Sequence, residues 1–145
     1  MQVDDTAHQM SISVEFDGLL STTTAAHVHC CTAVAGAGMV PVATITPSIP
    51  GFPESVSSGS CSMVFDTLLA STYRTGFITA SPGTPGTAEA ALLSSLRAGR
   101  ACFSVHRQMF SGREIRDFLA PAPQALPIAA LLPVVLPLLR CCNAA

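Results

Sequence analysis

The chain has 145 residues, which is enough for one domain with a buried core. Charged residues make up 11% of it, well below the roughly 25% of a typical soluble domain. The formal net charge is -2, lysine is absent and the seven arginines form no basic stripe, which argues against nucleic-acid binding. Abundant Thr, Ser, Gly, Pro and Val with few charges predict an all-β, turn-rich domain.

The first half of the chain predicts a polar tail followed by strands. Residues 1–10 are polar and acidic, and we expect them to form a disordered tail in which His8 is solvated. Residues 11–16 alternate polar and apolar side chains, the period of a half-buried strand, and Asp17-Gly18 follows as a turn. Further strands are predicted over 25–29, 40–46, 60–68, 101–106 and 114–119.

One helix is predicted, over 87–99. Thr87 is expected as its N-cap, because the hydroxyl can accept a hydrogen bond from the free N–H groups of the first turn. Gly99 is expected to end the helix in the left-handed conformation. Leu92, Leu93 and Leu96 belong to one apolar stripe, which we expect to pack in the core rather than to bind a cofactor.

The composition changes after residue 119. A Pro-rich linker begins there, and residues 125–139 are apolar without a charge. A membrane-spanning helix needs about 20 apolar residues, and the three prolines within this run would each remove a helical hydrogen bond. We therefore divide the chain into a tail over 1–10, a domain over 11–119, and a Pro-rich linker with an apolar C-terminal tail over 120–145.

His27 and His29 are the first candidates for a functional site. Successive side chains of a strand point to opposite faces, so these two share one face. Two imidazoles at this spacing can chelate one metal ion, or can be ordinary polar residues on the solvent face of a half-buried strand. His106, from another predicted strand, would complete a set of three nitrogen ligands for copper or zinc.

Glu114 and Arg116 share one face of the last predicted strand. Glu114 could orient a histidine ligand through a hydrogen bond. Alternatively, the histidines pair with Glu114 and Arg116 in a structural polar cluster that ties two strands together and needs no ligand. The chain has no G-x-S-x-G turn, no carboxylates paired on one face and no G-x-G-x-x-G loop, so we expect no catalytic residues and no enzyme.

Six cysteines are present, without the C-x-x-C pair of a zinc ribbon or a thioredoxin-like motif. Adjacent cysteines rarely bond to each other, because the bridge is strained. In an exported protein Cys30 or Cys31 could pair with Cys61 or Cys102, whereas in the cytosol all would be small buried hydrophobic residues. The acidic start is not a secretory signal, so we expect either a cytosolic protein or a start that lies upstream.

Taken in order, these motifs resemble those of CHRD (chordin-type) domains. That family has a T-A-A-H-I-H type strand, which residues 25–29 resemble. It closes with an N-V-H-T-x-x-F-P-G-G-E-I-R-G type segment, which Val105-His106 and residues 110–116 resemble, and residues 88–99 resemble the helix before it. The resemblance covers about residues 12–119. Ser111, Arg113 and Asp117 stand where the family has a proline and two glycines.

The resemblance implies a Greek-key, immunoglobulin-like or superoxide-dismutase-like β-sandwich with one short helix near 87–99. It implies a non-enzymatic, exported or cell-surface domain, which serves as a binding or structural module for an unknown protein or glycan.

The adjacent pair Cys30-Cys31 resembles that of a bacterial subgroup whose members are exported. The tail over 120–145 resembles a degenerate PEP-CTERM-type sorting signal, the one part expected to associate with a membrane. The His-x-His strand also resembles the copper-binding strand of Cu/Zn superoxide dismutases. The alternative function is therefore copper or zinc binding by His27, His29 and His106, without redox activity.

Overall fold

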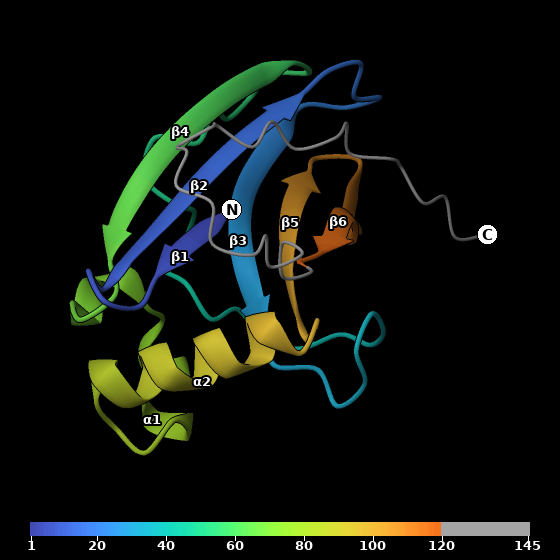
Figure 1. The fold of residues 1–145 in the computed structure, drawn as a ribbon. Coiled ribbons are helices and arrows are strands. Elements are labelled where there is room, and N and C mark those ends of the chain that lie inside the picture. Colours follow the sequence, from blue (N-terminus) through green and yellow to red (C-terminus); the bar gives the residue numbers. More distant parts are fainter. Residues whose placement is uncertain (120–145) are drawn as a thin grey trace, which may run out of the picture.

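The fold is a sandwich of two antiparallel sheets, each with three strands (Figure 1). The computed structural model describes residues 1–119, except for the side chains of residues 110–114. The strands are β1 (Gln2–Asp4), β2 (Gln9–Phe16), β3 (Thr23–Cys30), β4 (Gly59–Asp66), β5 (Ala101–Arg107) and β6 (Phe110–Phe118). The strand orders are β1-β2-β4 in one sheet and β3-β5-β6 in the other. The predicted all-β sandwich is confirmed.

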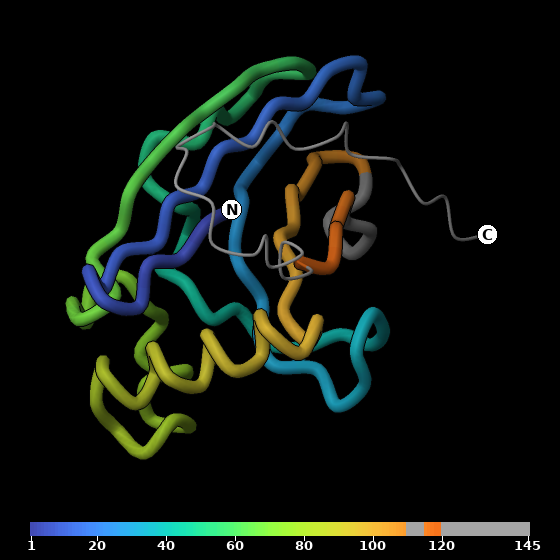
Figure 2. The backbone as a smooth tube through the Cα atoms, in the orientation of Figure 1, coloured from blue at the N-terminus to red at the C-terminus, as the bar shows by residue number. Residues whose placement is uncertain are grey.

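The core lies between the two sheets and is built from alternate residues of their strands. The buried apolar side chains of the strands include Met10, Ile12, Val14, Phe16, Phe65, Ala26, Val28, Phe103 and Val105. The helix α2 (Pro85–Arg97) lies across one end of the sandwich (Figures 1 and 2) and adds Ala88, Leu92 and Leu96 to the same cluster. Leu92 and Leu96 therefore pack in the core as predicted, whereas Leu93 of the same predicted stripe is only half-buried and lies outside the core cluster.

Helix α2 begins earlier than predicted. Its N-cap is Thr84 rather than Thr87, and proline occupies the first turn, where a missing N–H costs nothing. Thr84 Oγ1 accepts a hydrogen bond from Thr87 N–H at 3.2 Å, and Thr87 Oγ1 accepts one from Thr84 N–H at 3.1 Å. This reciprocal pair is a capping box. Gly99 has a φ of 65°, so the predicted left-handed end of the helix is confirmed.

Two short helical elements were not predicted. They are α1 (Thr75–Ala80) and a 3-10 turn (Ala70–Thr72). The expected strand over 40–46 is also replaced by an irregular segment, in which Val42 bridges to β3 and Thr44 bridges to Tyr73. Proline lacks the N–H that a regular ladder requires, and Pro41 and Pro47 bracket this segment.

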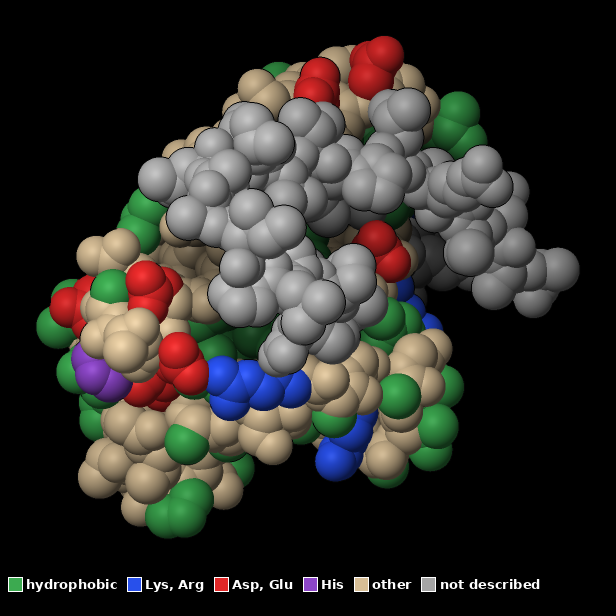
Figure 3. Space-filling view, viewed as in Figure 1, with side chains coloured by type: hydrophobic (Ala, Val, Ile, Leu, Met, Phe, Trp, Pro, Cys, Tyr) green, Lys and Arg blue, Asp and Glu red, His purple; other side chains and the backbone are tan. Residues whose placement is uncertain are grey.

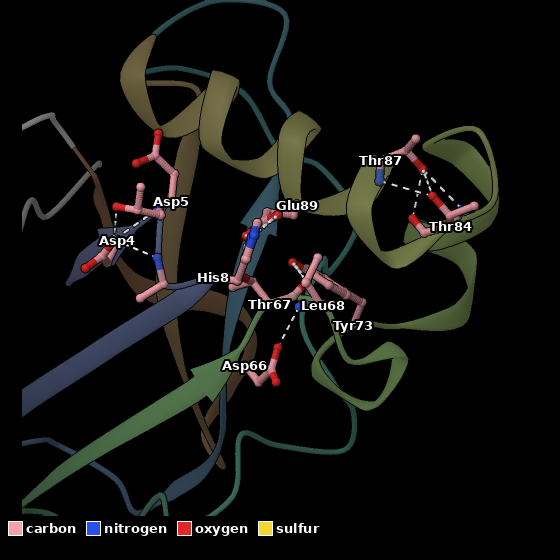
Figure 4. A network of polar contacts seen from close by, with 12 residues as sticks. Asp4, Asp5, His8, Asp66, Thr67, Leu68, Tyr73, Thr84, Thr87 and Glu89 are labelled. Carbon is pink, nitrogen blue, oxygen red and sulfur yellow. Dashed lines mark hydrogen bonds and ion pairs between the residues drawn. The ribbon is translucent and has the colours of Figure 1, made fainter.

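Residues 1–10, expected to be a disordered tail, belong to the fold instead. β1 pairs antiparallel with β2. Beyond it, His8 Nδ1 lies 3.0 Å from Glu89 Oε2 of α2, so this imidazole binds a buried carboxylate (Figure 4). Thr67 also donates a hydrogen bond to Glu89. The partners His8 and Glu89 lie 81 residues apart in the chain, which is why the sequence does not reveal the pair.

The N-terminal segment also contacts the end of α2. Arg97 Nη2 donates to Asp5 Oδ2 at 2.6 Å, and both side chains are more than half exposed. Figure 3 shows acidic side chains gathered beside arginine side chains on this face of the molecule. An exposed pair of this kind contributes little to stability, at most about 1 kcal/mol.

Cys30 and Cys31 form a disulfide with each other at the end of β3. This contradicts the expectation that adjacent cysteines do not pair, because the backbone there brings the two sulfur atoms together. Because Cys30 and Cys31 are bonded to each other, neither pairs with Cys61 or Cys102, as was considered from the sequence. Partial burial raises the pKa of the Cys61 thiol, so a smaller fraction of it is in the reactive thiolate form.

The predicted linker and tail over 120–145 lie outside the described residues. Among residues 1–119, no helix has the length and hydropathy needed to cross a membrane.

Candidate metal site

Three histidines come together on the outer face of the β3-β5-β6 sheet. Val28 of β3 and Val105 of β5 point into the core, so their neighbours His27, His29 and His106 point to the opposite face. His27 and His29 are nevertheless only 6% and 8% exposed. The histidine face of the sheet is thus outward in the sandwich but shielded from solvent.

The strand register aligns the three imidazoles. β3 and β5 are antiparallel, with His27 opposite Ser104, His29 opposite Cys102 and Ala25 opposite His106. Residues directly opposite each other in an antiparallel pair share a face. His106 is therefore two positions from Ser104 on the same side of β5, diagonally beside His27.

Ring nitrogens of the three histidines lie close to one another. One ring nitrogen from each of the three histidines lies within 4.8 Å of the other two. The ring centroids of His27 and His106 are 5.0 Å apart, and those of His29 and His106 are 5.8 Å apart. A metal ion with nitrogen ligands at about 2.0–2.1 Å in a tetrahedral arrangement needs ligand atoms about 3.3–3.4 Å apart, so the rings would have to move closer together to bind it.

Backbone carbonyls fix the protons of two of the rings. His27 Nε2 lies 2.6 Å from Pro47 O, and His29 Nδ1 lies 2.8 Å from Val40 O. A carbonyl oxygen can only accept, so the proton is on Nε2 of His27 and on Nδ1 of His29. In a neutral imidazole with this tautomer, the lone pair is on Nδ1 of His27 and on Nε2 of His29.

The segment that carries these carbonyls is attached along the edge of β3. Ala43 N–H donates to Val28 O at 2.9 Å, and Cys30 N–H donates to Pro41 O at 3.3 Å. Ile49 N–H donates to Ala26 O at 3.0 Å. Attachment on both sides of each histidine holds the irregular segment over 40–49 in place, and so holds the two imidazoles.

Arg116, which the sequence suggested as part of a structural polar cluster, also lies on this face of the sheet. It lies opposite Ser104 in the β5-β6 pair, and Ser104 lies opposite His27. Arg116 Nη1 donates to Gly38 O at 2.7 Å, and its guanidinium lies over the ring of Phe118. Glu114 is in β6, but its side chain lies outside the described part of the chain.

The donor set suits copper or zinc. Neutral imidazole nitrogens are common ligands of both metals. His29 Nε2 is buried, and within the described residues it has no hydrogen-bond partner. A buried imidazole nitrogen of this kind is costly unless something binds it, and a metal ion would do so.

Sequence reasoning did not find the carbonyls of Val40 and Pro47 or the position of Ser104. A carbonyl has no signature in the sequence, because every residue carries one. The alternation of residues 101–106 puts Ser104 on the same strand face as His106, but its position opposite His27 depends on strand pairing. Only the register of β3 with β5 reveals it.

Fold and site together define a small β-sandwich with a three-histidine cluster on the outer face of one sheet. The model of one family, the CHRD domain, matches residues 1–119. The chain therefore belongs to the CHRD domain family. No curated protein and no solved structure matches it.

Proposed function

We propose that this CHRD domain is a non-enzymatic binding module that holds one copper or zinc ion between His27, His29 and His106. The observation that carries the proposal is the cluster itself, with three ring nitrogens within 4.8 Å of one another. The carbonyl contacts of His27 and His29 support it, because metal-bound histidines usually donate their second N–H to such a group.

The ligand type favours copper or zinc over calcium or magnesium. Calcium and magnesium take oxygen ligands, and no carboxylate of the described side chains belongs to the cluster. Three protein ligands also leave a further coordination position on the metal. The family and the lack of a catalytic motif favour binding over catalysis.

Metal content tests this function. The protein is incubated with a twofold molar excess of copper or zinc and then desalted. Its metal content is measured by inductively coupled plasma mass spectrometry. We expect about one metal ion for each chain. Retention of no metal after loading would contradict the proposal and would leave the histidines as a structural polar cluster.

We also propose that the protein functions outside the cytosol, where an unknown protein or glycan is the partner of the CHRD module. The Cys30–Cys31 disulfide supports this, because disulfides persist mainly in oxidising compartments. The C-terminal tail over 120–145 is the part proposed to attach it to a membrane.

Peptide mapping of protein from its native cells tests the proposed compartment. Thiols are first blocked with an alkylating reagent, without reduction. We expect Cys30 and Cys31 to escape alkylation while Cys61, which forms no disulfide, reacts. Alkylation of all three would indicate a reducing compartment and would contradict export.

A further inference from the structure

A serine lies among the three histidines without a described partner. Ser104 is 0% exposed, and its hydroxyl makes no hydrogen bond within the described residues. It lies opposite His27, and two positions from His106 on the same face. Side chains directly opposite each other have Cβ atoms about 4.5–5.5 Å apart, so this hydroxyl lies beside the ligand cluster. A buried hydroxyl without a partner costs about 1–3 kcal/mol.

A positive charge lies on the other side of this serine. The cross-strand row runs from His27 through Ser104 to Arg116. Arg116 is fixed there, since Nη1 donates to Gly38 O at 2.7 Å and Cζ lies 5.4 Å from the centroid of the Phe118 ring. Gly38 is two residues before Val40, whose carbonyl binds His29. The arginine and the histidine cluster are therefore attached to the same segment.

No described carboxylate neutralises this arginine. The ion pairs among the described side chains join His8 to Glu89 and Arg97 to Asp5, both away from the histidine face. A divalent metal bound to three neutral imidazoles would place a second positive charge near Arg116. Two positive charges near each other repel, and an anion between them would offset the repulsion.

We propose that the metal keeps one coordination position for a small inorganic anion, which Ser104 and Arg116 help to bind. The Ser104 hydroxyl donates a hydrogen bond to the anion, and the Arg116 guanidinium attracts it electrostatically. This inference rests on the proposed function, because it requires a metal at His27, His29 and His106. It accounts for a buried serine, without a hydrogen-bond partner among the described residues, in the same cross-strand row as His27 and Arg116.

Azide titration of the copper(II)-loaded protein tests the inference. Azide bound to copper(II) gives a ligand-to-metal charge-transfer band, which reports binding directly. We expect the parent protein to show this band. Ser104→Ala should lower the affinity for azide about tenfold, as expected for one lost hydrogen bond to a charged group. Arg116→Gln should lower it at least as much, and Arg116→Lys should retain part of the affinity.

Copper content is measured for every variant before azide is added, so that binding of metal and anion are separated. Ser13→Ala, a serine on the exposed face of β2, and Arg97→Gln, an arginine at the end of α2, are the matched controls and should bind azide as the parent does. A copper-loaded parent without an azide band would overturn this inference and leave the metal site standing. Parental azide affinity in both Ser104→Ala and Arg116→Gln would also overturn it. A parent that takes up no copper would overturn the metal site and this inference together.

Discussion

The double variant His27→Ala/His29→Ala will bind no copper or zinc at concentrations that saturate the parent protein. Two of the three nitrogen ligands are removed, and a single remaining imidazole in a three-ligand site holds a metal ion only weakly. Changes in the groups that orient ligands typically lower metal affinity 10–100-fold. Loss of the ligands themselves should lower it further, by roughly another order of magnitude. The measurement is a titration against a chromophoric chelator that competes for the metal.

His8→Ala is the matched control for this titration. His8 is also a histidine with a polar partner, but it binds Glu89 of α2 and does not belong to the cluster. Its metal affinity should equal that of the parent. Equal metal affinity in the double variant and the parent would show that the metal binds elsewhere and would contradict the proposed site.

Leu92→Ala will lower the free energy of unfolding by about 2–5 kcal/mol. Leu92 is 2% exposed and packs in the core cluster where α2 closes one end of the sandwich. Its truncation removes apolar contacts and leaves a cavity that the two sheets cannot fill without moving. Urea unfolding followed by circular dichroism gives the free energy.

Leu20→Ala is the corresponding control, since Leu20 lies between β2 and β3 and is 82% exposed. It should change the free energy of unfolding by less than about 0.5 kcal/mol. If Leu92→Ala is as stable as Leu20→Ala, then α2 does not close the core as described. The folded Leu92→Ala protein should still bind metal, because the core lies on the other side of the sheet from the histidines.

Much of the fold follows from the alternation of residues along the chain. Burial of one sheet face imposes a period of two, and this period is plain in the sequence and the burial of β2. The same rule predicts that His27 and His29 share a face and that Cys102, Ser104 and His106 share another. It cannot predict that these two faces are the same one, because the pairing of β3 with β5 depends on packing between distant segments.

Local rules fail where several residues satisfy them equally. Thr84 and Thr87 are both good N-cap residues, and Pro85 is the residue that identifies Thr84 as the cap, because proline favours the first position of a helix. Residues 1–10 read as a tail because their polarity is visible, whereas the buried carboxylate of Glu89 that holds His8 is distant in the chain. The Cys30–Cys31 bond was also missed, because the rule that adjacent cysteines rarely bond to each other describes an average over many proteins and does not decide one case.

X-ray absorption spectroscopy at the metal edge tests the three-histidine site most directly. The spectrum of the zinc-loaded protein should show nitrogen ligands at about 2.0–2.1 Å and the multiple scattering of three imidazole rings. The same spectrum of His106→Ala should lose the contribution of one ring. A sulfur shell at about 2.3 Å, which indicates cysteine ligands, or oxygen ligands without imidazole scattering, would contradict a metal site at His27, His29 and His106.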